Sequence, residues 1–191
     1  MLSAHLGGGI VMIEMIVDSI RASLANQQRV LILKTRIDDR YLPVWIGPAE
    51  ADAIAIRLQK VAVPRPLTHD LLGSVISALG AALGFIVICD LRQDVFYAKL
   101  SLNINGKVLE VDCRPSDAIA LAVGVQAPIY VEESVLDKAG FTMDRESGRP
   151  TAMDAEARNS GKVSEEELKG LSVFRDFIEG LDMRDFDKGK K

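Results

Sequence analysis

The residues around Asn105-Gly106 constrain the fold most, because they fix both a turn and a strand register. Asn-Gly between two apolar runs favours a two-residue hairpin loop, since both residue types accept positive φ angles. A loop of two residues makes Ile104 face Lys107 and sets every later pair along the two strands. The sequence therefore predicts a hairpin with a defined register.

This register separates apolar from polar residues. One face pairs Leu102 with Leu109, Leu100 with Val111 and Ala98 with Cys113. The other face pairs Ser101 with Glu110, Lys99 with Asp112 and Tyr97 with Arg114. In these six pairs the apolar partners all fall on one face and the polar partners on the other, and we interpret the polar face as a solvated face with cross-strand ion pairs.

A helix should start directly after the hairpin, at Arg114-Pro115-Ser116-Asp117. Proline suits the first helical position, and a carboxylate two residues later stabilises the unpaired N–H groups at the positive end of the helix dipole. The same pattern occurs 67 residues earlier, where Pro48 matches Pro115 and Glu50 matches Asp117. We interpret this as a duplicated β-β-β-α unit. Neither copy could bury its helix alone, so the two form one α+β domain with a mixed or antiparallel sheet.

Other segments complete the expected domain. Strands are predicted at 15–25, 30–35, 42–46, 85–89, 95–102 and 127–131, with a turn at 90–94. Helices are predicted at 49–61 and from Thr68, the expected N-cap, through Leu79. Leu71, Leu72, Val75, Ile76 and Leu79 recur there at helical spacing.

The chain divides into four expected parts: an N-terminal extension (1–14), the domain (15–140), a flexible linker (141–163) and an acidic C-terminal helix with its tail (164–191). Ser164 and Glu167 form a capping box for that helix. Its apolar side carries Leu171, Phe174, Phe177, Ile178 and Leu181. It either docks on its own domain or binds a partner or neighbouring subunit.

Composition limits the functional classes. The 191 residues have a net charge of −4, which argues against a generally basic nucleic-acid coat but permits a local basic site. Cys89 and Cys113 lie in apolar runs and indicate buried thiols in a reducing compartment. No run reaches the ~18–20 apolar residues of a membrane span, and no signal peptide is apparent. We therefore expect a cytoplasmic protein with no membrane partner. Phosphate-loop, dinucleotide-binding, nucleophile-elbow and C-x-x-C motifs are absent from the sequence.

The residues alone do not decide which of them form a functional site. Arg114 beside a helix N-terminus suits phosphate binding, but a structural pair with Asp117 or a glutamate explains it equally well. His69 next to Asp70 fits a general base or metal ligand, or else a capping cluster at the start of a helix. Asp90 and Arg92 follow a buried strand, where site residues and turn caps both occur.

Three motifs give a stronger indication. PLTHDLL from Pro66, DLRQDVFYAKL from Asp90 and RPSDAIALA from Arg114, followed by APIYV, resemble the bifunctional nuclease domain, formerly a domain of unknown function. The resemblance runs from about residue 15 to about residue 140. It implies an α+β fold, degradation of DNA and RNA by some members, and homo-oligomers. Many relatives are expected to carry a basic residue where this chain has Val123-Gly124, which weakens the case for phosphate contacts from that helix.

The matching positions give the candidate site. Catalytic candidates are His69, Asp70, Asp90 and Asp117, and substrate-binding candidates are Arg92 and Arg114. In this hypothesis an acid holds a metal or activates water while the arginines bind phosphate, provided that the three motifs converge. A divalent metal is compatible with these acids, but its identity is unknown. The alternative hypothesis is a non-catalytic homo-oligomeric scaffold or regulatory binding module whose C-terminal helix recruits a partner.

Overall fold

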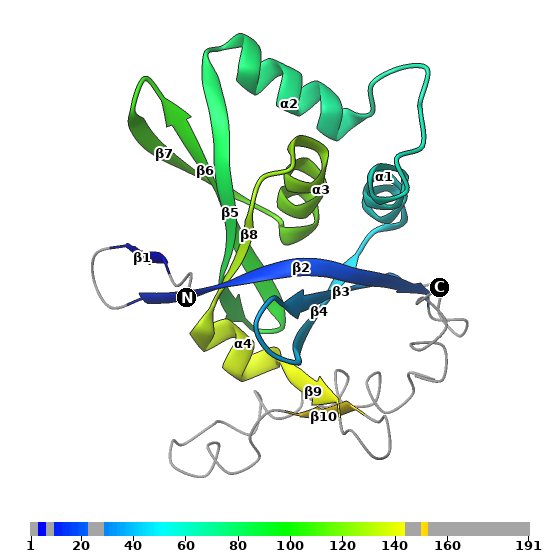
Figure 1. Ribbon diagram of the computed structural model, residues 1–191, viewed down its shortest axis with the longest axis vertical. Helices are drawn as coiled ribbons and strands as arrows, with labels where there is room; N and C mark the ends of the chain where they lie inside the picture. The colour runs from blue at the N-terminus through cyan, green and yellow to red at the C-terminus, as the bar shows by residue number, and fades with distance from the viewer. Residues whose placement is uncertain (1–3, 7–9, 23–28, 144–149, 153–191) are drawn as a thin grey trace.

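The computed structural model describes residues 4–6, 10–22, 29–143 and 150–152, and it shows one α+β domain (Figure 1). Most of the strands form two antiparallel three-stranded meanders. The first contains β2 (Ile10–Ala22), β3 (Arg29–Thr35) and β4 (Arg40–Ile46). The second contains β5 (Ala81–Arg92), β6 (Val95–Ile104) and β7 (Lys107–Cys113).

Strand β8 (Ile129–Glu132) joins the two meanders into one mixed sheet. It pairs antiparallel with β2 and parallel with β5, so the sheet order is β10-β9-β4-β3-β2-β8-β5-β6-β7. The short strands β9 (Phe141–Met143) and β10 (Pro150–Ala152) extend the sheet beyond β4, and β1 (Ala4–Leu6) pairs with β2. One meander therefore lies on each side of β8, and the two form the single α+β domain that the duplication predicted.

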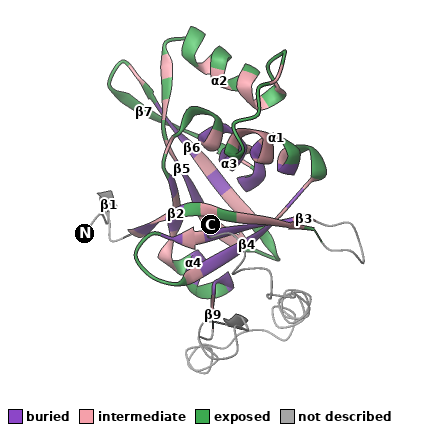
Figure 2. Cartoon of the chain, turned by 45° about the vertical axis from the view of Figure 1, so that its right-hand side comes forward, coloured by how far each residue is buried: buried purple, intermediate pink, exposed green. Residues whose placement is uncertain are grey.

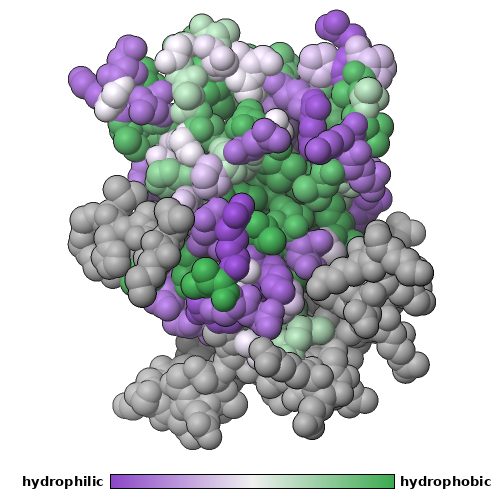
Figure 3. Space-filling view, in the orientation of Figure 1, coloured by the Kyte–Doolittle hydropathy of each residue, from purple (hydrophilic) through white to green (hydrophobic). Residues whose placement is uncertain are grey.

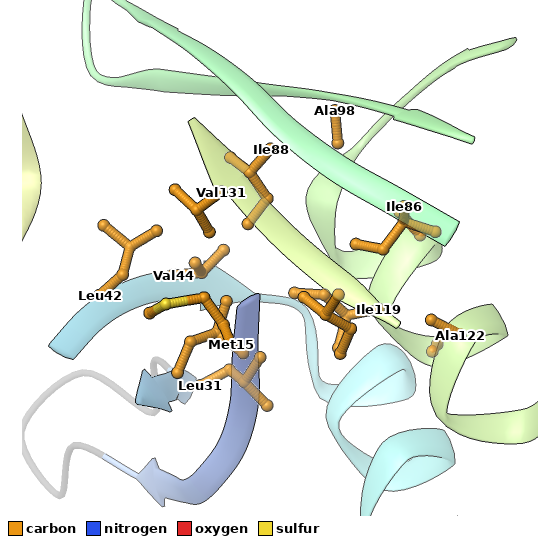
Figure 4. Close-up of a cluster of buried hydrophobic side chains, with 14 of the residues drawn as sticks. Met15, Leu31, Leu42, Val44, Ile86, Ile88, Ala98, Ile119, Ala122 and Val131 are labelled. Atoms are coloured by element: carbon orange, nitrogen blue, oxygen red, sulfur yellow. The ribbon is translucent and has the colours of Figure 1, made fainter. Parts of the chain in front are cut away.

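Each meander is followed by a helix of the same length. The helix α1 (Pro48–Leu58) and the helix α3 (Pro115–Val125) begin at the two aligned prolines, each at the first helical position. Both pack on the same side of the sheet, and α3 is the more deeply buried of the two (Figures 1 and 2). The core is continuous across both halves: Leu31 and Leu42 belong to the same buried cluster as Val131 and Ile88, and Leu42 lies toward Val131 (Figure 4).

The hairpin between β6 and β7 confirms the predicted register. Ala98 faces Cys113, Leu100 faces Val111 and Leu102 faces Leu109. Asn105 and Gly106 have φ angles of 51° and 80°, as the two-residue loop requires. One detail differs, because Lys99 pairs diagonally with Glu110, at 2.7 Å between Nζ and Oε2, rather than with Asp112. A long lysine reaches a diagonal neighbour on the same face.

The predicted turn at 90–94 is shorter than expected. Asp90 and Arg92 are part of β5, and the turn consists of Gln93 and Asp94, both with positive φ angles. The sequence also missed α4 (Glu133–Ala139), which follows β8, so β8 is not the last strand. Phe141, at the start of the segment predicted as a linker, is fully buried in β9 and stacks on Tyr41.

The helix α2 (Thr68–Ala78) lies at one end of the long axis, beyond α1 and α3 (Figure 1). Thr68 is its first residue rather than its N-cap. Leu67 occupies the cap position, and its N–H donates to Asp70 Oδ2 at 2.8 Å. No residue of α2 is buried, although apolar residues dominate it. None of the described helices is long and apolar enough to cross a membrane. The predicted C-terminal helix lies outside the described residues.

Candidate functional site

The starts of α1 and α3 meet at a single arginine side chain. Arg114 precedes α3, and Glu50 and Asp117 occupy the first turns of α1 and α3. Arg114 Nε donates to Asp117 Oδ2 at 2.6 Å, and its Nη2 donates to Asp117 Oδ1 and to Glu50 Oε1, each at 2.8 Å. One guanidinium thus links the two halves of the duplication.

The electrostatics of this contact favour the ionised forms. Burial alone would raise the pKa of Asp117, but hydrogen bonds from Arg114 and His69 outweigh it, and the pKa lies below its ordinary value. The hydrogen bond to Asp117 in turn raises the pKa of Arg114. The side chain of Glu50 is largely buried, whereas that of Arg114 is 68% exposed. The carboxylates are therefore held inside, and the arginine faces solvent.

His69 joins this group from the first turn of α2. Its Nε2 lies 3.4 Å from Asp117 Oδ1, and its side chain is only 15% exposed. We call Glu50, His69, Arg114 and Asp117 the helix-start cluster. It unites the first and third sequence motifs and contains three of the six predicted site residues.

Asp70, although adjacent to His69, points to a different partner. Its carboxylate accepts a hydrogen bond from Arg57 Nε of α1 at 2.9 Å and also caps α2 through Leu67. The hydrogen bond from Arg57 lowers the pKa of Asp70. Asp70 thus anchors α2 to α1, which fits the capping alternative. Arg57 was not among the residues predicted for the site, although a basic residue in the last turn of a helix is a common stabilising feature.

Asp90 and Arg92 form a separate pair. Arg92 Nε donates to Asp90 Oδ2 at 2.5 Å, and the guanidinium lies 5.0 Å from the centre of the Tyr97 ring. The hydrogen bond from Arg92 lowers the pKa of Asp90. Burial and then the charge of Asp90 raise the pKa of Glu132, at the end of β8. The second motif thus forms its own ion pair rather than joining the helix-start cluster through a described contact.

Gly47 stands where the second half has Arg114. A Cβ atom at Gly47 would collide with the carboxylate of Glu50, so Glu50 takes this position because glycine has no side chain. The first half therefore contributes an acid to the cluster, and it has no arginine at the position equivalent to Arg114. Among the residues that the structure describes, no three His, Cys, Asp or Glu side chains are placed to hold a metal ion.

Comparison with known proteins shows which family the described domain belongs to. The sequence model of the bifunctional nuclease domain matches residues 31–144, which contain both hairpins, α1 to α3 and the whole helix-start cluster. The chain belongs to the bifunctional nuclease domain family. This confirms the resemblance seen in the three motifs.

Two kinds of relative illustrate the range of the family. An uncharacterized protein of Mycobacterium tuberculosis, found in two strains, is 43% identical over 173 residues, covering 91% of this chain and 97% of its own length. Proteins of rice named bifunctional nuclease, from Oryza sativa and Oryza minuta, are 25% identical over 106 residues. That match covers 54% of this chain and 32% of the rice proteins.

Proposed function

We propose that this protein is a nuclease that hydrolyses phosphodiester bonds of DNA, RNA or both, and that the helix-start cluster is its site. The observation that carries the proposal is the contact between an exposed arginine, an ionised aspartate and a histidine inside the matched family domain. These groups have the chemistry that binding a phosphate and activating a water require.

His69 and Asp117 would supply the base. A neutral histidine whose ring is oriented by a carboxylate accepts a proton from water while that water attacks phosphorus. Asp117 is suited to the orienting role because its pKa is lowered, which keeps it ionised at neutral pH. The attacking water loses its proton to His69, and the leaving oxygen departs on the opposite side of the phosphorus.

Arg114 would bind the phosphate. Its described contacts use Nε and Nη2, so the two N–H groups of Nη1 make no hydrogen bond to a described residue. The carboxylates of Glu50 and Asp117 hold the guanidinium in place while Nη1 remains able to donate. The starts of α1 and α3 add partial positive charge, each equivalent to roughly +0.5 at a helix N-terminus, which offsets the two acids.

The test is a nuclease assay on purified full-length protein with single- and double-stranded DNA and with RNA, each with and without chelator. Wild type should cleave at least one substrate, and His69→Gln and Asp117→Asn should each lose roughly 10²–10⁴-fold, the usual contribution of general base catalysis. Loss of wild-type activity on chelation would assign a metal. Equal cleavage by all preparations would mean a contaminant or another site, and would overturn the proposal.

Asp90→Asn is the matched control for Asp117→Asn. Both remove a carboxylate that accepts a hydrogen bond from an arginine two or three residues away. The proposal places only Asp117 in the site. Asp90→Asn should therefore stay within a few-fold of wild type, and a larger loss there than in Asp117→Asn would move the site to the second motif.

We propose, as a second function, that the chain self-associates as a homo-oligomer and serves as a binding module. A specific observation favours this: three large apolar residues of α2, namely Leu71, Leu72 and Val75, are exposed, as is Leu79 at its C-cap. Exposed apolar patches commonly mark protein interfaces. We also propose that the protein acts in the cytoplasm, because the thiols of Cys89 and Cys113 are free and partly buried.

A further inference from the structure

The exposed side of α2 lacks charge altogether. The titratable residues of the helix, His69 and Asp70, both turn inward to Asp117 and Arg57. The outward positions are Thr68, Leu71, Leu72, Ser74, Val75, Ser77, Ala78 and Leu79, and we call them the outer face of α2. Leu71 is 58% exposed and Leu79 is 76% exposed. A solvated helix face normally carries charged residues, so this face is better suited to contact with protein.

A second exposed apolar surface lies at the same end of the molecule. Strand β7 is the edge of the sheet, and Leu109 and Val111 are 49% and 37% exposed. They share a face with Leu100 and Leu102, which are buried. Both α2 and the β6–β7 hairpin lie in the upper part of Figure 1, and hydrophobic surface is visible there in Figure 3 between hydrophilic residues.

The chain itself contains a sequence that suits such a surface. Residues 164–181 follow the last described residue, Ala152, by twelve positions and carry Leu171, Phe174, Phe177, Ile178 and Leu181. These spacings of three, four and seven place apolar side chains on one side of a helix. An amphipathic helix that lays such a side into an apolar groove is a common mode of recognition.

The length of the connection favours a second copy as the acceptor. Strand β10 and β7 are the two ends of the sheet order, eight spacings apart, or about 38 Å measured along the sheet at ~4.8 Å per strand. Figure 1 also places α2 and β10 at opposite ends of the molecule. Twelve residues reach about 40 Å only when fully extended. A flexible linker of that length has a root-mean-square span of roughly 20 Å. The chain's own α2 therefore lies near the limit of reach, whereas the α2 of a second copy can approach freely.

We propose that residues 164–181 of one copy bind the outer face of α2 and the exposed apolar face of β7, at the same end of the molecule, in a second copy. This contact is the means of the self-association proposed above, and it rests on that proposal. It buries the uncharged face of α2 and places the copies in contact beside the helix that carries His69.

The test uses full-length variants and sedimentation velocity over a range of concentrations. Val75→Lys changes the acceptor face, and Phe177→Ser changes the inserted segment. Each alone should weaken self-association at least tenfold. Val61→Lys is the matched control, because Val61 is as exposed as Val75, at 48% against 45%, but lies outside the outer face of α2. It should associate as wild type does.

Mixing the two variants distinguishes insertion between copies from docking within one chain. The Phe177→Ser chain retains an intact acceptor face, and the Val75→Lys chain retains an intact segment. An equimolar mixture should therefore regain one productive contact and associate more strongly than either variant alone. No recovery in the mixture would overturn the proposal.

Three other outcomes would also overturn it: a monomeric wild type, normal association of Phe177→Ser, or equal weakening by Val61→Lys. Normal association of Phe177→Ser together with loss in Val75→Lys would mean that the face binds another part of the second copy. Nuclease activity measured on the same samples keeps the two proposals separate. Cleavage without association contradicts only the docking, and association without cleavage contradicts only the nuclease.

Discussion

The two β-β-β-α halves share strand order and helix length but differ in what covers their third strand. In the first half, β4 lies inside the sheet beside β9, and Leu42 and Val44 are buried. In the second half, β7 is the sheet edge, and the equivalent Leu109 and Val111 are exposed. The aligned residues have the same types and lie 67 positions apart.

The halves differ again where their helices start. Gly47 leaves room for the carboxylate of Glu50, whereas Arg114 supplies a guanidinium that both halves use. The third strand of the first half is thus buried inside the sheet, whereas the second half exposes an arginine and an apolar edge strand. A duplicated unit can keep one copy for stability and use the other for contacts.

The largest expected difference between the halves comes from truncating the aligned leucines, Leu42 and Leu109. Leu42→Ala removes a fully buried side chain and should lower the free energy of unfolding by about 2–5 kcal/mol. Leu109→Ala, half exposed, should cost less than about 1 kcal/mol in a monomeric sample. Urea unfolding of both variants measures the difference. Equal losses would show that β7 is covered as β4 is.

The fall in the free energy of unfolding at acid pH tests the ion pair in the helix-start cluster. The pKa of Asp117 is lowered in the folded protein, so its stabilising contribution is present above the ordinary value of 3.8 and is lost as pH falls below it. Because Arg114 is well exposed, we expect a contribution of only about 1 kcal/mol. Asp117→Asn should lower the free energy of unfolding at pH 7. It should also make the fall of that free energy between pH 5 and pH 3, about one unit either side of the ordinary pKa, less steep. Parallel curves for the two proteins would contradict the pairing.

The smallest expected effect concerns the surface pairs of the two hairpins. Lys34 pairs with Asp39 at 2.9 Å in the first half, and Lys99 pairs with Glu110 at 2.7 Å in the second. Both pairs are partly exposed, so double-mutant cycles should give coupling energies of about 0.2–1 kcal/mol. A coupling above 2 kcal/mol for either pair would mean that it is far less hydrated than its exposure indicates.

Local sequence signals predicted those parts of the fold that local chemistry determines. Asn105-Gly106 gave the register of the hairpin, and Pro48 and Pro115 gave the starts of both helices. The helical spacing of α2 was also correct. Its exposure could not be predicted, because periodicity shows which residues share a face but not what covers that face.

The site was predictable only in part for a similar reason. Arg114 and Asp117 are close in sequence, so their pairing was one of the alternatives considered. The addition of His69 and Glu50 depends on how three helices pack, which no local pattern specifies. Asp90 and Arg92 satisfy each other within β5, and the hydrogen bonds described for the cluster do not include them.

The most direct test of the central claim compares Arg114→Ala with Arg92→Ala. Both variants remove an arginine whose side chain is 68% exposed and which is paired to an aspartate. Their nuclease rates should be measured side by side with wild type at saturating and limiting substrate. The account predicts that Arg114→Ala loses at least about 100-fold in kcat/KM, as expected when a phosphate-binding group is removed. Arg92→Ala should stay within about threefold of wild type. Full activity of Arg114→Ala, or a greater loss in Arg92→Ala, would contradict it.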